Sequence, residues 1–248
     1  MKILVCISDV PDTTTKIKFA GNKELDKAGI QWIINPWDEL SLTRAIELKE
    51  AHPDKIENIT VINVGTTASE PTIRKALAMG ADNAIRVDSE PKEAYFVAAQ
   101  LAEVIKSKQF DIVFTGLDSA DYNGSTVGGM LAELLDMTSV SAVSGINIED
   151  GKVIVSREID GGTQKLDVQT PFIAVVQKGI AIDPRIPAMR GIMMARTKPL
   201  EVVAPANIDN LTEIVEYEMP QPKGKCRKFT EENVNELVDV LHKEAKLI

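Results

Sequence analysis

Short apolar runs alternate with amphipathic stretches through the first two thirds of this 248-residue sequence, and no other feature restricts the fold so strongly. The apolar runs are nearly free of polar residues, as strands must be where helices cover both faces of a sheet. Strands that alternate with helices form βαβ units, so the sequence predicts a doubly wound parallel sheet of the Rossmann-like α/β class. The predicted strands cover residues 2–8, 32–34, 59–64, 84–87, 111–115 and 172–176, and the predicted helices cover residues 37–50, 69–80, 89–105 and 126–135.

The pattern changes from Val143 onward. Apolar and polar residues alternate there, and glycine-containing turns at 150–151 and 159–162 separate the alternating runs. Such alternation around tight turns is typical of antiparallel hairpins. An antiparallel ribbon is therefore expected beside the parallel sheet.

The last part of the chain is expected to form an extended arm and a helix. Residues 204–227 contain several prolines and little periodicity, which predicts an extended arm. Thr230 is a suitable N-cap for a final helix. The apolar face of that helix consists of Val234, Leu237, Val238 and Leu241. We therefore divide the chain into an α/β domain, 1–203, and an arm with a helix, 204–248. The arm either folds back on its own domain or packs on a partner subunit.

Composition excludes several functional classes. A formal net charge of −9 argues against nucleic-acid binding, which needs a basic surface. No apolar run approaches the roughly 20 residues of a membrane-spanning helix, and no secretory signal is expected. With only Cys6, expected as a buried thiol, and Cys226, a disulfide framework is not expected and the cytoplasm is the predicted location. His52 and His242 stand in polar surroundings, and neither a metal site nor catalytic residues are predicted.

Small and polar residues gather in the loops that follow the predicted strands. In an open parallel sheet, ligands bind outside the carboxyl ends of the strands, near the point where strand order reverses. The loop 116–127 contains hydroxyl and amide side chains and leads into a helix, whose first N–H groups favour a phosphate. It has neither the lysine of a Walker loop nor the glycine spacing of a dinucleotide loop, which predicts a nucleotide that is held rather than hydrolysed. The alternative is a polar loop that only caps the helix. The predicted nucleotide-binding residues are Cys6, Asn35, Pro36, Trp37, Asp38, Val64, Gly116, Ser119, Asp121, Asn123, Gly124, Ser125, Thr126 and Val127.

Three acidic residues near these loops have a simpler interpretation. Asp9, Asp12 and Asp38 are expected to act as turn and helix-cap residues, although Asp38 also belongs to the nucleotide-binding set. Either Asn35 or Asp38 is the expected cap of the helix over 37–50.

A second unusual segment spans residues 184–198. It reads P-R-I-P-A-M-R-G-I-M-M-A-R-T-K and combines basic side chains with apolar ones that no compact core requires. Methionine is flexible and polarizable, which suits contact with more than one protein surface. We predict a recognition loop here. The predicted docking residues are Arg185, Met189, Arg190, Ile192 and Met193.

Several stretches together resemble the beta subunit of an electron transfer flavoprotein. They are N-P at 35–36, R-K-A-L-A-M-G-A-D at 74–82, the loop 116–127, and R-E-I-D-G-G at 157–162 followed by I-P-A-M-R-G-I-M-M-A at 186–195. The resemblance covers essentially the whole chain. It implies an electron-carrier subunit without catalytic residues of its own, paired with a larger alpha subunit that holds the redox FAD.

The resemblance also implies ligands and partners. The loop 116–127 would bury an adenine nucleotide, which is AMP or, as in electron-bifurcating relatives, a second FAD. The implied docking partners are flavoprotein dehydrogenases of the acyl-CoA dehydrogenase type, which serve fatty acid oxidation. Met189 stands at the position of the hydrophobic docking anchor.

The chain departs from the family pattern in that loop. Many members have Gln-Ala-Ile-Asp where this chain has D-S-A-D at 118–121, followed by Tyr122, and non-bifurcating members often have Gln-Thr-Gly where it has T-V-G at 126–128. The Val-Gly ending is more similar to the bifurcating or bacterial branch. AMP and FAD therefore both stay open for this subunit.

Two hypotheses of other classes compete with an electron carrier. One is a free-standing adenine-nucleotide-binding enzyme, such as an ATP pyrophosphatase or a ligase domain. Those enzymes need a Ser-Gly-Gly-x-Asp-Ser type loop after the first strand, whereas residues 7–11 read I-S-D-V-P and lack the glycines. The other is a stress-type nucleotide-binding module, which leaves the arm and the Met-rich segment unexplained.

Overall fold

A nine-stranded sheet forms the centre of the computed structural model, which describes residues 1–248. Its strands are β1 (Lys2–Cys6), β6 (Asn58–Gly65), β7 (Asn83–Asp88), β8 (Ile112–Gly116), β9 (Thr138–Glu149), β10 (Lys152–Ile159), β11 (Gly162–Val168), β12 (Phe172–Val176) and β13 (Leu200–Val203). Their order is β11-β10-β9-β12-β8-β1-β6-β7-β13. In the part of the sheet with the order β9-β12-β8-β1-β6-β7-β13, all neighbouring strands pair in parallel. The strands β10 and β11 add an antiparallel ribbon beside β9, at one edge. The predicted fold class and ribbon are confirmed.

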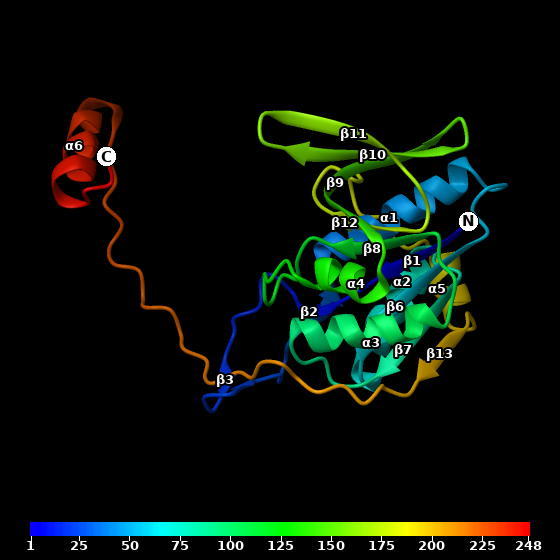
Figure 1. Cartoon of the computed structure of the whole chain (residues 1–248). Coiled ribbons are helices and arrows are strands. Elements are labelled where there is room, and N and C mark those ends of the chain that lie inside the picture. Colours follow the sequence, from blue (N-terminus) through cyan, green and yellow to red (C-terminus); the bar gives the residue numbers. More distant parts are fainter.

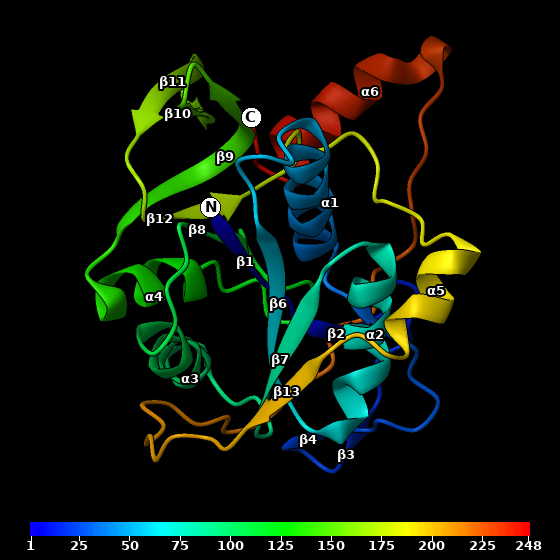
Figure 2. The ribbon, with the colours of Figure 1, turned by 90° about the vertical axis from the view of Figure 1, so that its right-hand side faces the viewer.

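Helices cover both faces of the sheet, and Figure 2 shows α1, α2 and α5 on one side and α3 and α4 on the other. The helices are α1 (Pro36–Ala51), α2 (Glu70–Met79), α3 (Ala94–Lys106), α4 (Val127–Leu135) and α5 (Met189–Ala195). Alternate strand residues enter two separate cores. In β1, Ile3 and Val5 belong to the core under α1 and α2, whereas Leu4 and Cys6 belong to the core under α3 and α4. Burial on both faces explains why the strands are nearly all apolar.

Local signals explain most helix boundaries. Gly80 ends α2 as predicted, with a φ of 148° that a residue with a side chain rarely adopts. The start of α3 was predicted too early, at residues 89–91. The Glu93 carboxylate accepts hydrogen bonds from the N–H groups of Tyr95 and Phe96 at 2.8 and 2.9 Å, and the helix therefore begins at Ala94.

Two small ribbons lie outside the main sheet. They pair β2 (Asp9–Pro11) with β5 (Trp32–Ile34), and β3 (Phe19–Ala20) with β4 (Glu24–Leu25). The second ribbon is a short hairpin around Gly21, which has a φ of 79°. The predicted strand over 32–34 forms, but it does not join the parallel sheet.

The C-terminal part of the chain extends away from the body (Figure 1). After β13, an edge strand that was not predicted, no regular element forms until a 3₁₀ turn, Glu231–Asn233. That turn leads into α6 (Val234–Asp239) and a π turn, Val240–Glu244. Thr230 caps this helix through a reciprocal contact with Asn233, as the sequence predicted.

Candidate functional site

The strand order reverses between β1 and β8. On one side of β1 lie β6, β7 and β13, and on the other lie β8, β12 and β9. The carboxyl ends of β1 and β8 therefore border the place where an open α/β sheet binds ligands. We call the loop that leaves β8, residues 116–127, the nucleotide loop.

Asp38, in the first turn of α1, joins these two strand ends. Its buried carboxylate accepts hydrogen bonds from the backbone N–H of Ser8 at 2.8 Å and from that of Gly116 at 3.0 Å. Burial raises the pKa of Asp38 to about 7, although hydrogen bonds from Ser8, Asn35 and Gly116 oppose the shift. A Cβ at position 116 would collide with the Asp38 carboxylate, so only glycine fits there. Asp38 therefore links two loops. The prediction that Asp38 caps its helix was wrong.

Asn35 fixes the path of the nucleotide loop. Its side-chain Nδ2 donates to the carbonyl of Asp118 at 2.8 Å, and its Oδ1 accepts from the N–H of Ala120 at 3.1 Å. Asn35 occupies the N-cap position of α1, but its side chain makes no capping hydrogen bond to the backbone of the helix. The predicted side-chain cap was wrong because the adjacent loop takes both of its polar atoms.

The nucleotide loop presents an exposed, uncapped helix start. Asn123 and Ser125 adopt left-handed backbone angles, with φ of 49° and 50°. Between them, a Cβ at Gly124 would have no neighbour nearer than the Thr126 hydroxyl, at 3.7 Å. Thr126 precedes α4 without bonding to it through its side chain. The first N–H groups of α4 therefore have no side-chain partner, which is the arrangement that binds anions.

The ends of β1 and β6 lie beside the switch point. Cys6 and Val64 are buried in the core under α3 and α4, so only their backbone is available to a ligand at the switch point. Burial raises the pKa of the Cys6 thiol, which keeps the thiol protonated, as expected of a core cysteine. On the other face of β6, the Asn63 side-chain amide donates to the Ile7 carbonyl at 2.9 Å and holds the loop after β1.

The two remaining acidic residues have different roles. Asp12 stabilises a turn, as predicted, by accepting the N–H of Thr14 at 2.8 Å. Asp9 instead accepts the hydroxyl of Thr72 on α2 at 2.5 Å, and burial raises the pKa of Asp9. Asp9 therefore ties the loop after β1 to a neighbouring helix.

The structure brings the predicted nucleotide-binding residues to one edge of the sheet. Sequence reasoning missed Ser8, Asn63 and Thr72, which hold the loop after β1. A signal was available for Asn63, because it is a lone amide in the apolar run I-T-V-I-N-V-G at 59–65. A buried polar side chain within a strand needs a hydrogen-bond partner.

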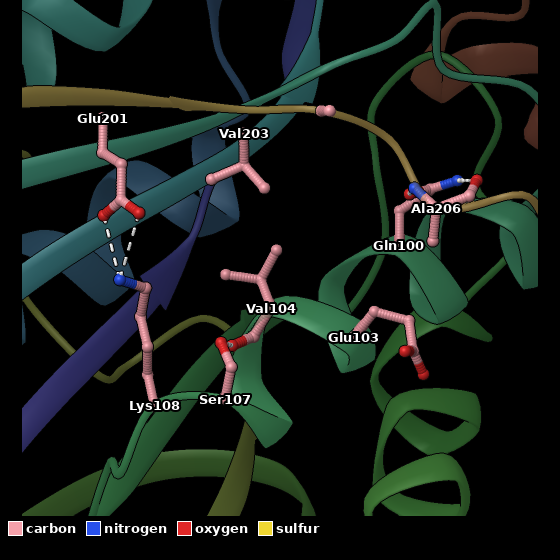
Figure 3. A pocket seen from close by; sticks show the side chains of 9 residues that line it. Gln100, Glu103, Val104, Ser107, Lys108, Glu201, Val203 and Ala206 are labelled. Carbon is pink, nitrogen blue, oxygen red and sulfur yellow. Dashed lines mark hydrogen bonds and ion pairs between the residues drawn. The ribbon is translucent and has the colours of Figure 1, made fainter.

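Two hollows in the surface lie elsewhere. One of about 200 Å³ separates α3 from β13 and is bordered by the Lys108–Glu201 ion pair and by Gln100 bonded to Ala206 (Figure 3). The other, about 560 Å³, opens at the amino ends of the strands, between Met1 and Phe110. Neither is lined by residues at the switch point, where the loops that follow several strand ends come together.

The predicted recognition loop contains a helix, α5. The helix was missed because the prolines at 184 and 187 and the glycine at 191 favour a loop. Apolar side chains on this segment point to solvent, and Met189 is 75% exposed and Met193 68% exposed. Met189 does not cover the core of its own domain. Residues 184–198, which we call the recognition segment, thus present an apolar surface on a formed helix.

Two basic side chains clamp the recognition segment to α2. The Arg74 guanidinium donates to the carbonyls of Ala195 and Lys198, both at 2.8 Å. In return, the Lys198 ammonium donates to the carbonyls of Leu77 at 2.9 Å and Ala81 at 2.5 Å. Each cation thus lies at the C-terminal end of the other helix, where the helix dipole favours positive charge.

A third basic residue anchors the start of the segment. Arg185 forms an ion pair with Glu50 at 2.7 Å, and its N–H bonds to the hydroxyl of Thr43. The charge of Arg185 is therefore compensated within the chain, whereas Arg190 is exposed and has no ion-pair partner. Of the predicted docking residues, Arg185 serves the anchoring of the segment.

No group of three histidine, cysteine or acidic residues is placed to hold a metal ion. The structure also contains no helix with the length and apolar character needed to cross a membrane.

Comparison with known proteins identifies relatives along almost the whole chain. Residues 24–208 match the family described as "Electron transfer flavoprotein domain". The chain is 38% identical over 234 residues to an electron transfer flavoprotein subunit beta of Syntrophomonas wolfei, which covers 94% of this chain and 91% of that protein. It is 32% identical to the Bacillus subtilis and 30% identical to the Bradyrhizobium diazoefficiens proteins of the same description, with both chains covered completely in each case.

Proposed function

The chain belongs to the electron transfer flavoprotein family, and we propose that it is the beta subunit of a heterodimer that carries electrons from flavoprotein dehydrogenases to an acceptor. Within that heterodimer a larger alpha subunit binds the redox FAD, which supplies the electron-transfer chemistry. The residues of this chain contribute binding and positioning. We place the heterodimer in the cytoplasm, in keeping with the use of only two cysteines.

The observation that supports this proposal best is the arrangement of strand-end loops at the switch point. The nucleotide loop, the uncapped start of α4 and the backbone of Cys6 and Val64 provide a cradle for an adenine nucleotide, which is AMP or a second FAD. The phosphate is assigned to the N–H groups of α4, because no side chain of the protein occupies them. Asp38 and Asn35 act from behind the loop, where they hold it in shape.

Two surfaces account for the proposed partners. The exposed apolar face of the recognition segment fits a dehydrogenase of the acyl-CoA dehydrogenase type, with Met189 as its anchor. The end of the arm fits the alpha subunit, because Val234 and Val238 of α6 are 49% and 54% exposed and no residue of that helix is buried. A free-standing nucleotide-hydrolysing enzyme would use neither surface.

The nucleotide assignment is tested at Gly124. A Cβ at this position meets no atom of the protein nearer than 3.7 Å, so we expect a valine to leave the fold intact and to crowd only a bound nucleotide. The complex co-expressed with its alpha subunit would be denatured, and released AMP and FAD counted per heterodimer. We expect Gly124→Val to lose most of the nucleotide of this subunit.

Gly162→Val provides the matched control, because position 162 on β11 also has open space around it and lies in the ribbon. The Gly162→Val complex should retain its full content of nucleotide. Full nucleotide content in the Gly124→Val complex would show that the nucleotide lies elsewhere. ATP turnover by the chain alone would favour the free-standing enzyme.

A further inference from the structure

The C-terminal arm consists of two parts that behave differently. Residues 204–217, which we call the strap, bond to the body. Residues 218–248, which we call the free arm, form all their hydrogen bonds and ion pairs among themselves. Figure 1 shows the strap passing β3 before the free arm leaves the body. The strap therefore belongs structurally to the α/β body.

Three fixed points hold the strap. The buried Gln100 side chain pairs with the backbone of Ala206, donating to its carbonyl at 2.8 Å and accepting its N–H at 2.9 Å. The Glu93 carboxylate that caps α3 also accepts the N–H of Leu211, at 3.3 Å. At the far end, the N–H of Tyr217 donates to the carbonyl of Asn22 at 2.7 Å.

Tyr217 brings the strap to the nucleotide loop. Its ring stacks on Phe19 of β3, with centroids 5.0 Å apart and planes 11° from parallel. Its hydroxyl lies 3.4 Å from the hydroxyl of Tyr122, which is part of the nucleotide loop. Burial raises the pKa of Tyr122, and the hydrogen bond with Tyr217 raises it further. Three aromatic residues thus join β3, the strap and the loop.

The nucleotide loop has few other supports on this side. Residues 120–126 are exposed, and Asn123 and Ser125 hold left-handed angles that residues other than glycine adopt uncommonly. Asn35 fixes the first half of the loop, up to Ala120. Beyond that point, Tyr217 is the only residue from outside the loop that the structure bonds to the side chains of residues 121–126.

We propose that Tyr217 is a positioning residue for the nucleotide loop, and that the strap holds this loop in its nucleotide-binding conformation. This inference rests on the proposed nucleotide site and goes beyond it, because it makes the strap part of that site. Linkage requires the effect to be mutual: if the strap favours nucleotide binding, a bound nucleotide favours a docked strap. A docked strap in turn fixes the point at which the free arm leaves the body.

The test compares Tyr217→Ala, Tyr217→Phe and Met219→Ala in the full chain. Met219 lies two residues further on, is 63% exposed and forms no bond to the body, so it controls for a change in the arm. AMP and, separately, FAD are titrated into nucleotide-free protein, and hydrogen exchange is followed in residues 117–126. We expect Tyr217→Ala to weaken nucleotide binding by about tenfold, since it removes an aromatic stack and a hydrogen bond, and to speed exchange in the loop. Tyr217→Phe keeps the stack and should fall between Tyr217→Ala and the wild type.

Each outcome decides something different. If wild-type protein binds AMP or FAD and Tyr217→Ala binds it as tightly as Met219→Ala does, the positioning role is overturned. If wild-type protein binds neither nucleotide, the proposed nucleotide site is wrong. The hydrogen-exchange data then test only whether the strap holds the loop. Faster exchange in Tyr217→Ala than in Met219→Ala supports the contact between strap and loop, and equal exchange rejects it.

Discussion

The recognition segment and the free arm both expose apolar side chains, but they differ in how they are attached to the body of the protein. Arg74 and Lys198 clamp the recognition segment to α2, and Arg185 anchors its start. The free arm has no bond to the body at all, and its helix α6 contains no buried residue. One apolar surface is held in place by the body of the protein, and the other has no contact that fixes its position on that body.

This difference suits two kinds of association. A surface that is already ordered loses little conformational entropy on binding, so a small contact can form and dissociate quickly. A segment that orders on binding costs more, and a large buried area has to offset that cost. The recognition segment therefore fits a transient electron-transfer contact, and the free arm fits a lasting subunit interface.

Removal of the free arm should produce the largest effect. A chain that ends at Glu218 keeps the strap and every contact of the body, so its melting temperature should stay within about 2 °C of the full-length value. We expect its affinity for the alpha subunit to fall by at least about 1000-fold, which corresponds to about 4 kcal/mol. Co-purification of the two chains, followed by titration, measures this loss.

A shorter chain that ends at Val203 separates strap from free arm. It should lose the alpha subunit to the same degree and, in addition, bind AMP or FAD more weakly. Unchanged co-purification after removal of residues 219–248 would show that the α/β body carries the subunit interface.

Gly191→Ala should give a smaller effect that is confined to the recognition segment. A Cβ at position 191 would meet the carbonyl oxygen of Ala78, so α5 has to move away from α2. Such overpacking typically costs about 1 to 3 kcal/mol. We expect the KM of the dehydrogenase for this protein to rise by about thirtyfold. FAD content and binding of the alpha subunit should not change.

Gly224→Ala is the matched variant in the free arm, where a Cβ meets no atom within 4 Å. It should be silent in both assays. If Gly191→Ala keeps its normal KM for the dehydrogenase, pre-ordering of α5 is unimportant for docking.

Periodicity predicted the parallel core well because its strands are buried on both faces. Runs such as residues 59–64 carry a clear apolar signal, and Gly80 ends its helix at the expected residue. The same reasoning placed the nucleotide loop, since the topology of an open sheet sends the carboxyl ends of its strands to one edge. Most of the secondary structure of the core, and the place of this loop at the edge of the sheet, therefore followed from local patterns.

Contacts between distant residues could not be predicted in this way. Asp38 and Asn35 stand where helix caps are expected, but their partners lie about 80 residues further along the chain, at Gly116 and Ala120. The α5 helix depends on Arg74, which is more than 100 residues away in sequence. Local propensity does not contain such tertiary contacts, and here they override it.

Met189→Ala should give the smallest effect and defines what the ordered surface contributes. Met189 is 75% exposed and begins α5, so truncation removes apolar contact area without opening a cavity. Loss of an interface anchor of this size costs about 1 to 3 kcal/mol, and we expect dehydrogenase docking to weaken by about tenfold. The melting temperature, FAD content and binding of the alpha subunit should stay at wild-type values.

The Gly191→Ala and Met189→Ala changes lie on one helix. A larger loss of docking for Gly191→Ala would therefore show that the position of α5 matters more than any single side chain on it. Equal losses would assign the docking energy to Met189 itself, and a Met189→Ala protein with normal electron transfer would place the docking surface elsewhere.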